Sequence, residues 1–178
     1  MATYIQIGST VTVGSGGAAS IDFTSIPSTY TDLVVKFSLR QNNTSSSVGY
    51  NWLGTRFNGS TATYTGRLLY AASNTVGSAS FSDTQFRQYG FDNNSWTSGT
   101  ANTFSNGEIY IPNYTSATNK SISVDSVAEI NAANGSGLGI FAGLWPVSSA
   151  ITSISIYDLD AYNFVQYSTA TLYGILKN

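Results

Sequence analysis

Leu33-Val34-Val35-Lys36-Phe37-Ser38-Leu39-Arg40 is the stretch of this sequence that indicates the fold most clearly. Every second residue from Leu33 to Leu39 is apolar, whereas Lys36, Ser38 and Arg40 are polar. A period of two is typical of a strand that has one face in a core and the other in solvent. The sequence therefore predicts a half-buried β-strand over residues 33–40.

The same alternation recurs in shorter form along the chain, and no segment has a convincing helical apolar face. The apolar pairs are Ile5/Ile7, Val11/Val13, Ile21/Phe23, Ile109/Ile111, Ile122/Val124 and Ile154/Ile156. Residues 170–176 are predicted to form a strand with both faces buried. Gly-, Ser-, Asn- and Thr-rich clusters separate these runs and favour turns. The predicted turns cover residues 14–17, 41–49, 72–80, 92–102, 113–119 and 131–139.

Strands and turns at this spacing predict an all-β sandwich or barrel. The chain has 178 residues and shows neither an internal repeat nor a linker, so a single domain over residues 1–178 is expected. Gly135-Ser136-Gly137-Leu138-Gly139 lacks the glycine spacing and the lysine of a phosphate-binding loop, and we interpret it as a turn.

The composition excludes several kinds of chemistry. His and Cys are absent, so the chain has no His-centred triad, no thiolate nucleophile and no disulfide framework. Charged residues make up 9% of the chain, and Ser, Thr and Asn together make up about a third. Such low charge is a solubility handicap, which favours burial of surface in an assembly; the alternative is that hydroxyls and amides suffice for solubility.

Neither nucleic acid nor a membrane is expected as a partner. The formal net charge is −2, and the seven basic residues form no cluster that could bind a phosphate backbone. No apolar run approaches the roughly 20 residues needed to span a bilayer. Residues 1–4 lack the basic and apolar regions of a secretory signal.

The nine carboxylates are dispersed, which argues against an acid-catalysed hydrolase. Asp158 and Asp160 form the one pair two residues apart, and on a strand they could share a Ca²⁺ ion. We favour the alternative that they end a strand and accept hydrogen bonds from local backbone amides. No catalytic residue, metal or cofactor is therefore expected.

The tryptophans have two different settings. Trp96 lies in the polar stretch 93–99 and could stack on a sugar or anchor a partner; alternatively it folds back as a lid over the end of the sandwich. Trp52 and Trp145 adjoin apolar residues and are interpreted as core or interface fillers.

Three stretches together carry a resemblance that spans nearly the whole chain. They are Ser20 to Val35, Glu108 to Tyr114, and Tyr167 to Ile175. The sequence resembles small Ser/Thr/Asn-rich β proteins encoded among the virion genes of tailed bacteriophages. The resemblance implies a single antiparallel, jelly-roll-like β-sandwich that serves as a virion surface component, commonly trimeric, with no catalytic residues to carry over.

The leading hypothesis is a non-enzymatic capsid decoration (cement) protein that bridges and stabilises the shell. It predicts a homotrimer, made in the host bacterial cytoplasm and located in the virion, which binds the major capsid protein or another virion protein. Tyr4, Ile5 and Ile7 in the N-terminal segment are the predicted partner contacts. The alternative is a receptor- or carbohydrate-binding head module of a tail or head fibre, with Trp96 contacting a host surface glycan.

Overall fold

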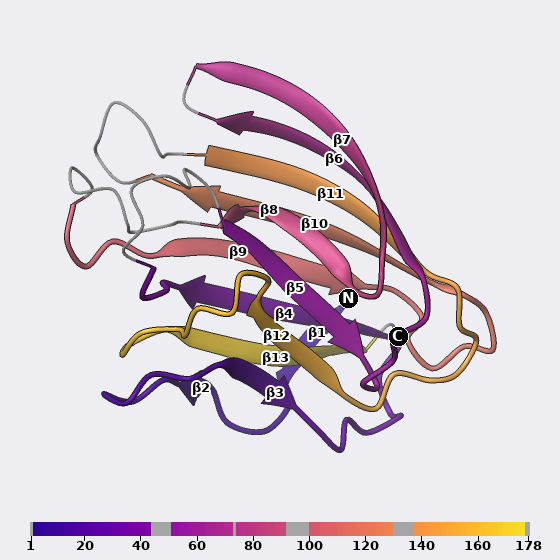
Figure 1. Ribbon diagram of the computed structural model, residues 1–178. Helices are drawn as coiled ribbons and strands as arrows, with labels where there is room; N and C mark the ends of the chain where they lie inside the picture. Colours follow the sequence, from indigo (N-terminus) through magenta and orange to yellow (C-terminus); the bar gives the residue numbers. More distant parts are fainter. Residues whose placement is uncertain (1, 44–50, 73, 92–99, 130–136, 177–178) are drawn as a thin grey trace.

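Alternating residues form β-strands throughout the described part of the chain, which contains no helix (Figure 1). The computed structural model describes residues 2–43, 51–72, 74–91, 100–129 and 137–176. Its strands are β1 Thr3–Gln6, β2 Val11–Thr12, β3 Ser20–Phe23, β4 Asp32–Leu39, β5 Asn51–Phe57, β6 Tyr64–Ala72, β7 Thr75–Asp83, β8 Phe86–Phe91, β9 Ser105–Ile111, β10 Lys120–Ala128, β11 Gly137–Trp145, β12 Ile154–Asp158 and β13 Thr169–Leu176.

The strands form two antiparallel sheets that face each other. The larger has the order β1-β13-β4-β9-β10-β11-β6-β7, with β2 also paired to β13, and the smaller has the order β3-β12-β5-β8. Strands β1/β2-β13-β4-β9 opposite β3-β12-β5-β8 have the strand order of a jelly roll. Two inserted hairpins, β6–β7 and β10–β11, add four more strands to the larger sheet. The predicted all-β sandwich is confirmed.

Strand β4 lies in the jelly-roll part of the larger sheet, between β13 and β9. Leu33, Val35 and Leu39 are fully buried and Phe37 is nearly so, whereas Lys36 is exposed. Val34 on the opposite face is also fully buried, so the predicted alternation matches the burial only from Val35 onward.

A cluster of aromatic rings fills the space between β8 and the inserted hairpins. Phe57 packs edge-on against Phe86 and Trp145, with ring centroids 5.5 and 5.6 Å apart. Tyr64 packs against Phe86 at 4.7 Å. Strands β6, β10 and β11 all contact β8, so this cluster holds the insertion onto the smaller sheet. Trp145 is a core residue, as its apolar neighbours predicted.

Two predicted turns are strands instead. Residues 75–80 belong to β7, which pairs with β6 in unbroken register, and residues 137–139 begin β11. Packing explains Gly77 in β7, because a Cβ there would lie 2.6 Å from the Tyr70 ring. The predicted turns at 14–17 and 113–119 are confirmed.

The last strand, β13, is less buried than predicted. Ala170, Leu172 and Gly174 are buried on one face, whereas on the other face Ile175 is buried but Thr171 and Tyr173 are only half-buried. The smaller sheet covers one face of β13, and the opposite face is the outer surface of the sandwich. The prediction of two buried faces was therefore wrong in part.

Replacing Phe86 by Ala tests the role of the aromatic cluster. Deleting a fully buried ring leaves a cavity between the sheets and is expected to lower the free energy of unfolding by about 3–5 kcal/mol. Phe81→Ala is the matched control, because Phe81 is only half-buried beside Trp52. This substitution should lower the free energy of unfolding by less than Phe86→Ala does. Urea unfolding of both variants measures the difference; equal losses would contradict the proposed role of the cluster.

Candidate interaction surface

The two inserted hairpins have one face against the core and one face outward. Residues alternate between these faces along β6, β10 and β11. We call the outward face of β6, β7, β10 and β11 the extension face. Its residues are Thr65, Arg67, Leu69, Ala71, Val76, Ser78, Ser80, Ser82, Ser121, Ser123, Asp125, Val127, Leu138, Ile140, Ala142 and Leu144.

Large aliphatic side chains gather at one end of the extension face. The strand register places Val127, Leu138, Ala71 and Val76 in one row across the four strands. Ile140 and Leu69 lie side by side in the next row. Val76 is 75% exposed, Ile140 60% and Leu69 55%, so solvent reaches most of this surface. A contiguous exposed apolar patch of this kind marks an interaction surface.

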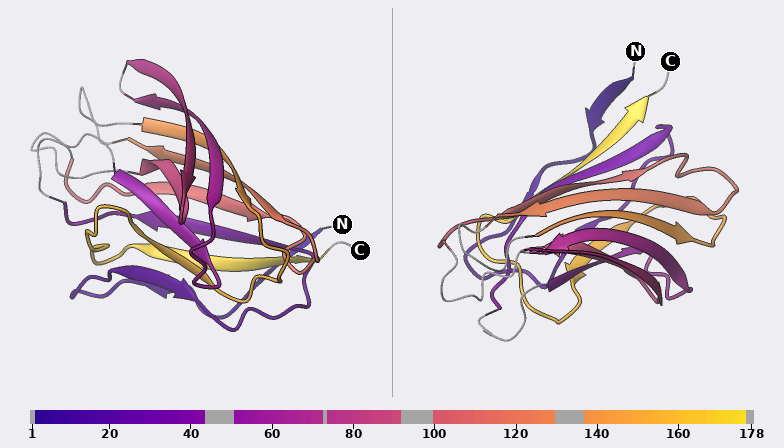
Figure 2. Two further views of the ribbon diagram at one scale, coloured as in Figure 1. Left: turned by 45° about the vertical axis from the view of Figure 1, so that its right-hand side comes forward. Right: turned by 90° about the horizontal axis from the view of Figure 1, so that it is seen from above.

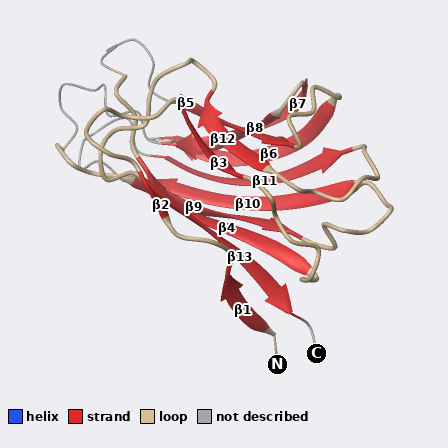
Figure 3. Cartoon of the chain, turned by 90° about the horizontal axis from the view of Figure 1, so that it is seen from below, coloured by secondary structure: helices blue, strands red, loops and turns tan. Residues whose placement is uncertain are grey.

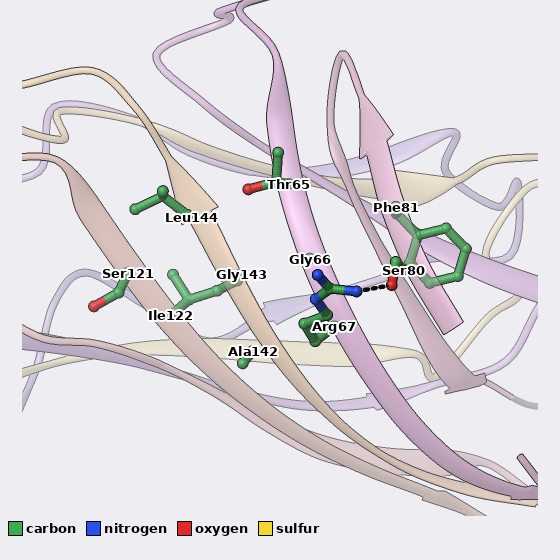
Figure 4. Close-up of a pocket in the computed structure, with 10 residues that line it drawn as sticks. All are labelled: Thr65, Gly66, Arg67, Ser80, Phe81, Ser121, Ile122, Ala142, Gly143 and Leu144. Carbon is green, nitrogen blue, oxygen red and sulfur yellow. Dashed lines mark hydrogen bonds between the residues drawn. The ribbon is translucent and has the colours of Figure 1, made fainter. Parts of the chain in front are cut away.

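Charge on the extension face is limited to one cation and one anion. Arg67 lies on β6 and Asp125 on β10, on opposite sides of β11. The Arg67 guanidinium donates a hydrogen bond to the Ser80 hydroxyl on β7 (Figure 4). Within the described residues, neither Arg67 nor Asp125 forms an ion pair. Both charges therefore remain available to an external partner.

A shallow cavity of about 490 Å³ lies at the more polar end of the extension face (Figure 4). Arg67, Ser80, Ser121 and Leu144 surround it, and Ala142 lies in the middle strand. Its hydroxyls and guanidinium can donate hydrogen bonds. Its lining contains no nucleophile–base pair.

The N-terminal strand lies at the opposite end of the larger sheet. Strand β1 pairs with the end of β13, and the two project together beyond the other strands (Figures 2 and 3). Tyr4 is 52% exposed and Ile5 37%, while Ile7 is half-buried and packs against the core. Of the three predicted contacts, the structure leaves Tyr4 and Ile5 accessible, and Ile7 anchors the segment through a backbone hydrogen bond to Leu172.

The Tyr4 ring contacts an aromatic ring and a lysine ammonium group on the outer surface of the sheet. Its ring packs edge-on against Tyr173, with centroids 6.3 Å apart, and the Lys36 ammonium lies 5.8 Å from its centre. Lys36 also forms an ion pair with Glu108 at 3.0 Å. The hydrogen bond to the Glu108 carboxylate, together with its charge, raises the pKa of Lys36. Tyr4 thus has one aromatic and one cationic neighbour on the outer surface of the sheet.

Two carboxylates, Asp158 and Asp32, accept hydrogen bonds within the fold. Asp158 Oδ1 accepts hydrogen bonds from the backbone amides of Asp160 and Tyr162, at 2.8 and 3.2 Å, as the favoured interpretation predicted. Asp32 is fully buried and accepts hydrogen bonds from the Tyr110 hydroxyl and the Asn113 amide. The described residues contain no group of three or more potential metal ligands.

The remaining predicted contact, Trp96, lies outside the described residues, and its role stays a prediction. Trp52 packs edge-on against Phe81 at 5.2 Å, and the Arg87 guanidinium lies over its ring. Trp52 is therefore a filler between β5 and β7, as predicted.

Sequence reasoning missed the extension face. Leu69, Ile140, Arg67 and Asp125 belong to no recognisable motif, and they come together only through strand pairing. The available signal was the series Leu138, Ile140, Ala142 and Leu144, in which every second residue of β11 is apolar and faces outward.

Comparisons with known proteins identify no relative: no family model, no curated protein and no solved structure matches the chain. In the part of the chain that the structure describes, no helix is long and apolar enough to cross a membrane.

Buried tyrosines make the fold sensitive to alkaline pH. The Tyr64 hydroxyl accepts a hydrogen bond from the Phe57 amide at 3.1 Å, and the Tyr114 hydroxyl donates one to the Pro27 carbonyl. Burial raises the pKa of both phenols, because the phenolate would lose its hydration. Burial also lowers the pKa of Lys120, whose ammonium donates hydrogen bonds to two backbone carbonyls.

We therefore expect stability to be nearly constant from about pH 6 to 9, since the chain has no histidine. Above about pH 10 the unfolded tyrosines ionise first, so the stability contributed by the raised pKa values of Tyr64 and Tyr114 is lost. Lys120 acts in the opposite direction and offsets part of the loss.

The variant Tyr64→Phe isolates the tyrosine contribution. It removes one ionising group and should flatten the fall in unfolding free energy above pH 10, measured by urea unfolding at a series of pH values. If the free energy of unfolding of the variant falls with pH as steeply above pH 10 as that of the unmodified protein, titration of Tyr64 contributes nothing to the loss of stability.

Proposed function

We propose that this chain is a non-enzymatic structural protein of a bacteriophage virion, a decoration (cement) protein that bridges and stabilises the capsid shell. The observation that carries this proposal is that one continuous sheet has exposed apolar side chains at both of its ends. Tyr4 and Ile5 lie at the β1 end, on opposite faces of that edge strand, and the extension face lies at the β7 end. A bridging protein needs two contact surfaces in a fixed relation, and this sheet supplies them.

The physical mechanism is burial of surface. Each apolar area removed from water stabilises a contact by about 25 cal/mol per Å² before the costs of association are subtracted. The described residues hold neither His nor Cys, and the carboxylates Asp32 and Asp158 are engaged by hydrogen bonds within the fold. Binding without chemistry is the activity that these surfaces support.

The jelly-roll strand order and the resemblance to tailed-phage virion proteins give further support. The proposed assembly is a homotrimer located in the virion, with the major capsid protein or another virion protein as its partner. We assign the N-terminal strand to that partner, through Tyr4 and Ile5.

Binding to empty capsids tests this function. Capsids of the encoding phage assembled without this protein should bind the purified chain and then rupture at a higher temperature, measured by calorimetry. Ile5→Asp should weaken binding about tenfold or more, because it places a charge in an apolar contact. Thr12→Asp is the matched control, because it adds the same charge at an exposed position on β2, outside the proposed contact, and should change binding less.

Absence of binding to capsids would contradict the proposal. The alternative, a receptor- or carbohydrate-binding fibre head, rests on Trp96; it predicts adhesion to host cells that Trp96→Ala abolishes. Adhesion to cells together with failure to bind capsids would favour that alternative.

A further inference from the structure

We infer that the extension face is the surface through which copies of this chain assemble, with Arg67 of one copy pairing with Asp125 of the next. The inference deepens the proposed function, since it names the interface of the proposed oligomer. The observations that carry it belong to the isolated chain and do not depend on where in a virion the protein is located.

The first observation is the combination of apolar area and low charge. Ile140, Leu69, Val76, Leu138 and Val127 are all close to half-exposed or more, and they form neighbouring rows on one face. Two identical surfaces repel each other when both carry the same net charge, but this face carries one cation and one anion. Its net charge is zero, so self-contact is free of that penalty.

The second observation is the position of the two charges. Arg67 lies on β6 opposite Ala142 of β11, and Asp125 lies on β10 opposite Ile140 of β11. One strand, β11, separates Arg67 from Asp125, and the two charges do not pair within the chain. The two charges are therefore complementary between copies rather than within one.

These positions suit a cyclic arrangement around β11. When copies are placed around an axis that runs along β11, the β6 side of one faces the β10 side of the next. Arg67 and Asp125 of neighbouring copies are then offset along the axis by two residues, about 7 Å, and the long Arg67 side chain has to extend along the axis to reach the carboxylate. The outward side chains of β11, Leu138 and Ile140, surround the axis. A head-to-tail contact of this kind closes into a ring. The ring buries the aliphatic surface that the isolated chain exposes.

Sedimentation velocity of the purified full chain over a range of concentrations tests the apolar part of this interface. The unmodified protein is expected to be oligomeric at micromolar concentration. Ile140→Lys should raise the dissociation constant at least tenfold; its side chain points to solvent in the monomer, so the fold should be retained. Thr12→Lys adds the same charge on the exposed strand β2 and should leave assembly unchanged. Circular dichroism checks that both variants are folded.

A charge exchange tests the ionic part without removing any apolar contact. Arg67→Asp and Asp125→Arg each place like charges together and should weaken assembly, more strongly at low salt. The double variant restores opposite charges and should recover most of the lost affinity, as a direct pair requires. Failure of the double variant to recover would refute the pairing.

A monomeric unmodified protein, or an oligomer indifferent to Ile140→Lys, would overturn the inference. Were the face reserved for another virion protein, the purified chain would remain monomeric at all concentrations, and the inference would fail in the same way. A monomeric protein that still binds capsids would contradict this inference but support the proposed decoration function. Oligomers that bind no capsid would contradict only that function.

Discussion

The structure depends on how the two sheets of unequal width are packed together. The smaller sheet ends at β8, and the aromatic rings of Phe57, Phe86 and Trp145 extend its contact to β6, β10 and β11. A Cβ on Gly143 would lie 2.4 Å from the Phe86 ring, so this packing also fixes which residues the neighbouring strands can carry. The rings cover the inner side of the insertion, and nothing in the described chain covers its outer side. The extension face is the direct consequence.

The same sheet connects the two ends that bear exposed apolar side chains. Hydrogen-bonded strands run without interruption from β1 to β7, so Tyr4 and the extension face belong to one backbone ladder. The buried polar groups Asp32, Asp158 and Lys120 each have hydrogen-bond partners within the chain. A chain with little charge thus keeps an ordered interior and uses its apolar exterior for contact.

The sequence allowed the fold class to be predicted, but only part of the surface. The period of two over residues 33–40 predicted β4 because one face of that strand lies in the core and the other carries Lys36 and Ser38, although Val34 on this outer face is buried as well. In β11 both faces are apolar, since Phe141 faces the core and Ile140 faces solvent, so no polar–apolar alternation shows. In β7, Gly77 is needed beside the Tyr70 ring, and together with the neighbouring small residues it gives this strand the composition of a turn. Arg67 and Asp125 were not predictable, because they are 58 positions apart and strand register alone relates them.

The central claim is that this chain is a structural bridge on a phage capsid. Electron cryomicroscopy of the phage particle tests it most directly, because the sandwich is large enough to be located in a density map. The account predicts density for this chain on the capsid surface, spanning neighbouring capsid subunits, with β1 against the shell and the extension faces of adjacent copies in contact. Density confined to the tip of a tail or head fibre, or absent from the particle, would contradict it.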